Sequence, residues 1–172
     1  MGTGILMCGL NGAGKSTLGK ALADRLNYRF IDNEDLYFPK TDPDYMYAAE
    51  RTRAEVEELL LSEIKTHENF VFTSVKGDYG NALPFNFAVL VSVPREIRLQ
   101  RVKERSLRKF GDRALLGGDL YERERGFFGL VSSRAENTVE EWIRSFGGPV
   151  IRVDGTKPID DNIRLIIKKI YH

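Results

Sequence analysis

Short apolar runs alternate along the chain with segments of helical periodicity. Five runs have the length and composition of buried strands: residues 4–8, 28–32, 69–75, 87–93 and 149–154. Two of them, "NFVFTSV" and "FAVLVSV", are continuously apolar, which is typical of strands that are covered on both faces. Strands that alternate with helices predict an α/β fold with a five-stranded parallel sheet and helices on both of its faces.

The segments between these runs supply the helices. Apolar spacing or helix-start signals predict helical structure at 18–26, 44–67, 94–110, 138–146 and 163–170. Pro94 suits the first position of a helix, and Thr138 with Glu141 has the spacing of a capping box. The glycines, proline and asparagines of 76–86 predict a loop.

Composition narrows the class of protein. A chain of 172 residues, 42% hydrophobic, suits a single soluble domain with a real core. Its 26 basic and 25 acidic residues leave a net charge of +1, so no overall field attracts it to nucleic acid or membranes. The single cysteine, Cys8, is predicted to be a small buried hydrophobe in a reducing compartment. Without a membrane-length apolar run or a basic leader, the expected location is the cytoplasm.

The first motif is "GLNGAGKST", which joins the predicted strand 4–8 to a helix. Its spacing is that of the phosphate-binding loop, or P-loop, in which backbone N–H groups cradle nucleotide phosphates. Lys15 supplies charge for the β- and γ-phosphates, and Ser16 supplies a hydroxyl for Mg²⁺. A glycine turn without a ligand is the alternative, but the strand-to-helix context favours the nucleotide site. The predicted phosphate contacts are Gly9, Asn11, Gly12, Ala13, Gly14, Lys15, Ser16 and Thr17.

Carboxylates follow two of the predicted strands. "IDNEDLY" places Asp32, Glu34 and Asp35 after the run 28–32, and Asp78 follows the run 69–75. Ligands of open α/β sheets bind at the carboxyl edge, so Asp32, Asp35 and Asp78 are candidate contacts for a phosphate acceptor or hydrated Mg²⁺. Asp32 is also a candidate base for an attacking hydroxyl. The alternative is a turn or a helix cap, where Asp is equally favoured.

Arginines gather on one predicted helix. Arg98, Arg101, Arg105 and Arg108 are spaced so that they share one helical stripe, and Arg113 follows closely. One interpretation of the stripe is a solvent-exposed helix face whose arginines pair with nearby glutamates. Exposed ion pairs stabilise a fold by only about 0 to 1 kcal/mol, which gives little reason to gather them. We therefore expect some of these guanidinium groups to contact phosphate, with Arg101 and Arg105 as catalytic candidates.

Three segments together resemble the adenylate kinase-like family of small P-loop kinases: "GLNGAGKST", "VPREIRLQRVKER" and "VDGTKPIDDNI". The resemblance implies the fold of a nucleoside monophosphate kinase and an ATP donor. It also implies that Arg101 and Arg105 are the two arginines at the edge of the lid. The third segment is similar to the family's adenine-side loop, which here consists of Gly155, Thr156, Lys157 and Pro158.

The departures from that family concern the acceptor. Adenylate kinases carry Asp-Gly-Phe-Pro-Arg after strand three, whereas this chain has "SVKGDYG", so the acceptor need not be AMP. The long lid is replaced by "SLRKFGDRALLGGDLYERERGFF", which predicts a short helical lid with a glycine break. The carboxylate after the second strand is similar to that of shikimate and gluconate kinases, whose acceptors offer a hydroxyl.

The sequence thus predicts one P-loop kinase domain over 1–172, with an acceptor-binding helical segment at about 36–68 and a lid at about 105–135. Arg51 and Arg53, on the former segment, are candidate acceptor contacts, although either could be a surface residue. The predicted reaction is phosphoryl transfer from ATP, with Mg²⁺, to a nucleotide, nucleoside or polar metabolite. Two alternatives stay open, a nucleotide-binding sensor without transferase activity and a kinase for nucleic-acid ends, although the near-neutral charge argues against nucleic acid. The sequence leaves the oligomeric state open.

Overall fold

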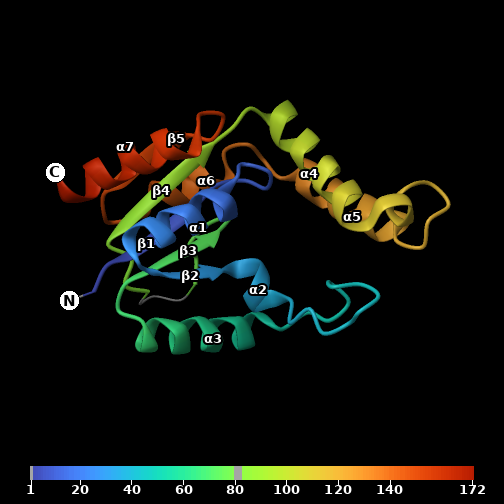
Figure 1. Ribbon diagram of the computed structural model, residues 1–172, viewed down its shortest axis with the longest axis horizontal. Coiled ribbons are helices and arrows are strands. Elements are labelled where there is room, and N and C mark those ends of the chain that lie inside the picture. The colour runs from blue at the N-terminus through green and yellow to red at the C-terminus, as the bar shows by residue number, and fades with distance from the viewer. Residues whose placement is uncertain (1, 80–82) are drawn as a thin grey trace.

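A parallel sheet forms the centre of the structure, a computed structural model that describes residues 2–79 and 83–172 (Figure 1). The strands are β1 (Gly4–Cys8), β2 (Arg29–Asp32), β3 (Phe70–Ser74), β4 (Phe87–Ser92) and β5 (Val150–Asp154). They lie in the order β2-β3-β1-β4-β5, and every neighbouring pair is parallel. The predicted five-stranded parallel sheet is confirmed, and all five carboxyl ends meet at one edge.

Seven α-helices and one 3₁₀ helix occur in the described residues. They are α1 (Lys15–Leu26), α2 (Asn33–Tyr37), α3 (Arg53–Thr66), α4 (Arg95–Phe110), η1 (Gly111–Ala114), α5 (Tyr121–Ser133), α6 (Thr138–Ile143) and α7 (Ile159–Tyr171). The predicted loop 76–86 carries no helix or strand in its described part, and residues 80–82 lie outside the description.

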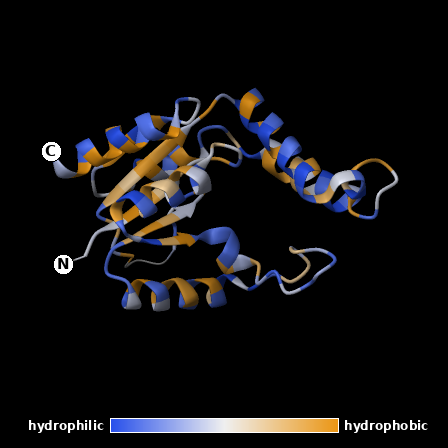
Figure 2. Ribbon diagram, viewed as in Figure 1, coloured by the Kyte–Doolittle hydropathy of each residue, from blue (hydrophilic) through white to orange (hydrophobic). Residues whose placement is uncertain are grey.

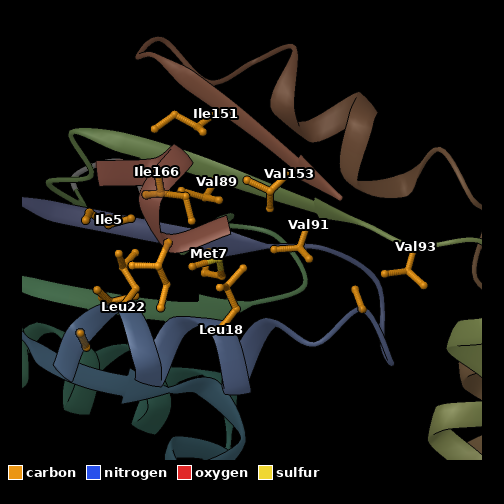
Figure 3. Packing of buried hydrophobic residues seen from close by; sticks show 14 residues of the cluster. Ile5, Met7, Leu18, Leu22, Val89, Val91, Val93, Ile151, Val153 and Ile166 are labelled. Carbon is orange, nitrogen blue, oxygen red and sulfur yellow. The ribbon is translucent and has the colours of Figure 1, made fainter. Parts of the chain in front are cut away.

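The sheet separates two hydrophobic layers. Ile5 and Met7 of β1 pack in the layer formed with α1 and α7 (Figure 3), whereas Leu6 and Cys8 face the layer formed with α3 and α6. Both faces of β1 are therefore buried, which explains its continuous apolar sequence. Burial also raises the pKa of the Cys8 thiol to about 12, so Cys8 is the unreactive buried hydrophobe that the sequence predicted.

The helices α4 and α5 form an arm that extends away from the sheet (Figure 1). Residues 111–120 break the arm between the two helices, in agreement with the predicted helical lid and its glycine break. The strands are largely hydrophobic, whereas polar and apolar positions alternate along the arm (Figure 2). This pattern is that of helices with one packed side and one solvated side.

The prediction of helix from residue 44 onward is wrong for its first part. Residues 38–52 form an irregular loop, here called the 38–52 loop, and α3 begins only at Arg53. The Asp42 side chain accepts hydrogen bonds from the N–H groups of Asp44 and Tyr45, which closes a turn where a helix was expected. The start of α3 is fixed by a capping box between Thr52 and Glu55.

The capping box predicted at Thr138 and Glu141 is also wrong. Asn137 is the N-cap of α6, and the Thr138 hydroxyl donates backwards to the carbonyl of Ala135 over 2.7 Å. The helix ends at Ile143, earlier than predicted. At the start of α4, Pro94 is the N-cap, one position before the place expected for it.

Candidate active site

A large cleft, here called the main cleft, opens at the carboxyl edge of the sheet and has a volume of about 1300 Å³. Its walls come from the P-loop, the ends of β2 and β3, the α4–α5 arm and the loop after β5. Most of the predicted site residues line it: Asn11, Gly12, Ala13, Gly14, Lys15, Ser16, Thr17, Asp32, Asp78, Arg101, Arg105, Gly155, Thr156, Lys157 and Pro158. Gly9, Asp35 and Arg51 do not.

The P-loop obtains its shape from glycines in backbone conformations that other residues avoid. Gly12 has φ +82° and Gly14 has φ +91°. A Cβ on Gly12 would lie 2.3 Å from the carbonyl oxygen of Arg98, so the loop passes directly against the backbone of α4. Gly9 is confined by another element, because a Cβ there would lie 2.6 Å from the carbonyl oxygen of Val91 in β4. Gly9 therefore packs the end of β1 against β4 rather than lining the cleft.

Replacement of Gly12 by alanine is expected to damage both stability and nucleotide binding. A left-handed conformation costs a residue with a Cβ roughly 1–2 kcal/mol, and the contact with Arg98 adds to that cost. Gly117→Ala is the matched control, since Gly117 has φ +90° but no atom within 4 Å of the added Cβ. Urea unfolding and ATP titration should show a larger loss for Gly12→Ala. Equal losses in the two variants would contradict the close approach.

Lys15 lies at the centre of the electrostatics of the main cleft. Its Nζ donates to the carbonyl of Leu10 over 3.2 Å, and its side chain is partly buried. Burial lowers the pKa of the ammonium to about 8; Asp32 opposes this shift, while the positive charges of Arg105 and Arg134 add to it. The group is thus held among charges that a phosphate anion would balance.

ATP binding is expected to take up a proton above about pH 8. In the nucleotide-free protein, Lys15 loses its charge as the pH rises through about 8, whereas a bound triphosphate favours the charged form. Affinity should therefore fall with rising pH by up to about tenfold per unit. Calorimetric titration at pH 8.5 in two buffers of different ionisation enthalpy measures the uptake, and Lys15→Arg should abolish it. Equal apparent enthalpies for the native protein in the two buffers would contradict this.

Asp32 ends β2 and also caps the next helix. One carboxylate oxygen accepts the N–H of Glu34 over 3.0 Å, so the turn-and-cap interpretation is correct for this residue. The same residue lines the main cleft and acts electrostatically on Lys15, so the cap fixes the carboxylate beside the P-loop. Asp35 instead points to Lys40, with Oδ1 2.5 Å from Nζ. Only the first of the two predicted carboxylates therefore reaches the cleft.

The floor of the main cleft contains an unpartnered hydroxyl. Thr73 pairs with Asp32 across β2 and β3, and it is 1% exposed. Its Oγ1 is the one buried side-chain polar atom that lacks a hydrogen-bond partner within 2–79 and 83–172. A buried hydroxyl without a partner is costly, so a ligand or a bound water is the natural partner at this position.

The third predicted carboxylate, Asp78, lies in a small charged group on the cleft wall. Its side chain is 3.2 Å from Lys76 Nζ and 3.8 Å from Arg53 Nη2. The Arg53 guanidinium also lies 4.0 Å above the centre of the Tyr79 ring. Arg51 takes no part in this group, because its Nη1 donates to the carbonyl of Leu36 over 2.9 Å. Arg51 thus holds the chain after α2 instead of facing the cleft.

The arginine stripe divides into groups with different partners. Arg98 is 3% exposed and donates to the carbonyl of Asn11 over 3.1 Å and to Glu136 over 2.5 Å, so it supports the P-loop from behind. Arg113 pairs with Asp119 at the end of the arm, 2.7 Å apart, outside the main cleft. Arg101, Arg105 and Arg108 line the cleft, as the stripe hypothesis expected of some members.

Arg101 and Arg105 lie in different environments. Arg101 donates to the carbonyl of Gly12 over 3.3 Å and to that of Gly155 over 3.2 Å, which ties the P-loop to the loop after β5. A Cβ on Gly155 would lie 2.6 Å from the carbonyl of Ala13, so these two loops are in close contact. Arg105 is exposed in the cleft and close enough to Lys15 to affect its pKa. Arg101 therefore belongs to the side with Gly155, and Arg105 to the phosphate side.

Sequence reasoning missed several residues of the cleft. Arg134, just after α5, donates to the Asn11 side chain over 2.6 Å and brings a further positive charge to the P-loop. Phe38 lines the cleft from the C-cap of α2. Neither residue belongs to a motif. Glu34, which the sequence placed at the same edge as Asp32, also lines the cleft.

No group of three or more His, Cys, Asp or Glu side chains with a metal-binding arrangement occurs in the described residues. The oxygen donors of the cleft beside the P-loop include the Ser16 hydroxyl and the Asp32 carboxylate, and Mg²⁺ commonly completes such a set with phosphate oxygens and water.

Among the helices in 2–79 and 83–172, none is both long and apolar enough to cross a membrane.

The comparisons with known proteins agree with this geometry. A family model described as an AAA domain matches residues 5–114, which is more than half of the chain. The chain belongs to this AAA domain family. This AAA domain is also similar to the uncharacterized protein YqaC of Bacillus subtilis (strain 168), with 24% identity over 173 residues, 95% of this chain and 94% of that protein.

Two further similarities of this AAA domain are to kinases. A shikimate kinase of Thermosynechococcus vestitus is 28% identical over 112 residues, which cover 60% of this chain and 61% of that enzyme. The chain thus matches about three fifths of that relative's length. A deoxyadenosine kinase from M. mycoides, solved with bound dATP, has a TM-score of 0.59 at 19% identity. The match covers 99% of this chain and 100% of the kinase chain. The fold is that of a P-loop kinase, of the nucleoside monophosphate kinase type.

Proposed function

We propose that this protein transfers the γ-phosphoryl group of ATP to a hydroxyl group of a small acceptor. The observation that carries the proposal is the set of charges that line the main cleft beside the P-loop: Lys15, Asp32, Arg105 and Arg134, the last of which donates to the Asn11 side chain over 2.6 Å. Two arginines and a lysine can balance the charge of a transferring phosphoryl group, and a carboxylate can accept the proton of the attacking alcohol. The kinase relatives support the same reaction class, since deoxyadenosine and shikimate are both alcohols.

In the proposed reaction, the groups of the main cleft have different tasks. The P-loop N–H groups and Lys15 bind the β- and γ-phosphates. Asp32 accepts the acceptor's O–H proton as the oxygen bonds to the γ-phosphorus and the bond to the β-phosphate oxygen breaks. Arg105 and Arg134 stabilise the charge that spreads over the equatorial oxygens. The products are ADP and a phosphate ester.

The residues present fit a magnesium ion. Ser16 offers a hydroxyl at the start of α1, and the unpartnered Thr73 hydroxyl and Asp32 offer oxygens for its bound water. When bound, Mg²⁺ neutralises the phosphates and helps the leaving group to depart.

The donor is expected to be ATP rather than GTP. Gly155, Thr156, Lys157 and Pro158 line the main cleft, and Arg101 donates to the carbonyl of Gly155, which supports the adenine-side role that the sequence resemblance implied. The α7 helix begins directly after this loop and fixes its end. Initial rates at limiting nucleotide should favour ATP, and equal turnover with GTP would count against the assignment of this loop.

A product screen with γ-labelled ATP tests the proposed reaction. The acceptors are pooled nucleosides, nucleotides, sugars and shikimate, and labelled esters are separated by chromatography. Asp32→Asn should lower transfer by roughly 10²- to 10⁴-fold, the usual contribution of a positioned base, with ATP affinity little changed. Asp35→Asn is the matched control, because this carboxylate lies outside the cleft. ATP binding without a labelled product in any pool would favour the sensor instead.

A further inference from the structure

A second cavity, here called the side cavity, adjoins the main cleft. It has a volume of about 280 Å³ and lies between the 38–52 loop, α4 and α5. Four residues line both spaces: Glu34, Phe38, Arg105 and Phe127. A ligand whose reactive end lies in the main cleft can therefore extend its other end into the side cavity.

Five aromatic residues line the side cavity: Phe38, Tyr45, Tyr47, Phe110 and Phe127. Phe38 and Tyr47 meet edge to face with centroids 5.0 Å apart, and Tyr45 lies 5.6 Å from Tyr47 in the same manner. Phe110 of α4 closes the cluster at 5.3 Å from Tyr45 and 6.1 Å from Tyr47. Val102 adds an aliphatic surface. Ring surfaces of this kind favour a flat apolar group.

One carboxylate gives the side cavity a polar contact. Glu124 is 9% exposed and accepts hydrogen bonds from the hydroxyls of Tyr45, over 3.0 Å, and Ser106, over 3.1 Å. In the part of the chain that the structure describes, no cation lies within ion-pair distance of it. A carboxylate has about four acceptor sites, so Glu124 keeps capacity for further donors. An N–H group of a ligand would satisfy it.

Polar contacts hold the two sides of the side cavity together. Arg113 Nη1 donates to the carbonyl of Asp44 over 2.6 Å, which ties the arm to the 38–52 loop. Lys109 donates to the Tyr47 hydroxyl and lies 3.9 Å from Glu34. The cavity is thus enclosed by two segments that are far apart in sequence and bonded to each other.

We infer that the phosphate acceptor is an alcohol carrying a flat nitrogen heterocycle with an N–H donor, as a nucleoside does. The ring occupies the side cavity with its N–H group directed at Glu124, and the alcohol reaches Asp32 past Glu34. At about 280 Å³, the space is smaller than the roughly 300–1,000 Å³ that holds a whole drug-sized ligand, so it suits one end of the acceptor. The inference rests on the proposed kinase function and specifies its substrate class.

Titration calorimetry measures the affinity for candidate acceptors and so tests the inference without turnover. The protein, held with Mg²⁺ and β,γ-imido ATP, is titrated with adenosine, cytidine, thymidine, ribose and shikimate. Stacking of a base on aromatic residues contributes about 10- to 100-fold in affinity, so at least one nucleoside should bind that much more tightly than ribose. If ribose or shikimate binds as tightly as every nucleoside, the inference is overturned.

Two variants and a control locate the ring. Phe110→Ala should weaken the bound nucleoside by about tenfold or more while binding of β,γ-imido ATP changes less than about threefold. Leu107→Ala is the matched control, because Leu107 is exposed on the same helix and does not line the side cavity. Equal effects of the two substitutions on the nucleoside would refute the site. A loss of β,γ-imido ATP binding equal to that of the nucleoside would assign the cavity to the donor and overturn the inference.

Glu124→Gln tests the polar contact while keeping the shape of the side chain. Adenosine is compared with purine riboside, and cytidine with its analogue lacking the amino group. The variant should weaken only the ligands that carry the amino group, and a uniform loss would overturn this contact. Cavity-dependent nucleoside binding with no labelled product would support the site but refute the kinase proposal. Phosphorylation of a polyol at a rate that Phe110→Ala does not change would support the kinase proposal but refute the site in the side cavity.

Discussion

Replacement of Lys15 by alanine should reduce phosphoryl transfer by at least about 10³-fold and leave the fold intact. The loss is large because Lys15 supplies a positive charge at the P-loop, and no neighbouring N–H group can replace a full charge. Stability should change little, since Lys15 belongs to neither hydrophobic layer and donates only to the carbonyl of Leu10.

Single-turnover rates and thermal unfolding on the same preparations measure both effects. Lys20→Ala is the matched control, because Lys20 lies on the same helix and only forms an exposed pair with Asp24. The control should retain full activity. A Lys15→Ala protein with native rates would remove the P-loop from the proposed reaction.

The second large effect is expected for Arg105→Ala, with kcat reduced by about 10²-fold or more and ATP affinity by less than about tenfold. An arginine that meets phosphoryl charge mainly in the transition state accelerates transfer more than it strengthens ATP binding. Lysine should restore little, because a point charge lacks the planar fork of donors. Arg125→Ala, an exposed arginine of α5 outside both cavities, is the control.

Arg101→Ala should show the opposite balance. Its hydrogen bonds hold the P-loop to Gly155, so its loss should raise the KM for ATP more than it lowers kcat. Steady-state kinetics and nucleotide titration separate the two cases. If both variants lose binding and turnover equally, the arginines only hold ground-state phosphate, and the sensor hypothesis gains support.

The phosphate side of the site could be predicted because its signals are local in sequence. Three glycines and Lys15 lie within seven residues between a strand and a helix, and the helical stripe fixes which arginines share a side of α4. The sequence could not separate the members of that stripe. Arg98 is buried by Glu136 and the back of the P-loop, whereas Arg105 is left in the cleft, and only the packing distinguishes them.

The side cavity could not be predicted because the residues that line it come from distant segments of the chain. Glu34, Tyr45, Phe110 and Glu124 carry no motif, and the contacts between them depend on how the 38–52 loop meets the arm. The sequence also predicted helix from residue 44, where the structure has this loop. Its conformation depends on the Asp42 turn and on contacts with α4 and α5, which no periodicity expresses.

The bond from Arg113 to the backbone of Asp44 joins the two walls of the side cavity, and this has a consequence for protein engineering. Under the proposed assignment of the side cavity, acceptor specificity does not depend on the 38–52 loop alone. A loop grafted from a relative would meet Phe110 and Glu124 in place of its own partners unless the arm were exchanged with it. Substitutions in the two segments should therefore prove epistatic, and libraries aimed at a new acceptor should vary both together.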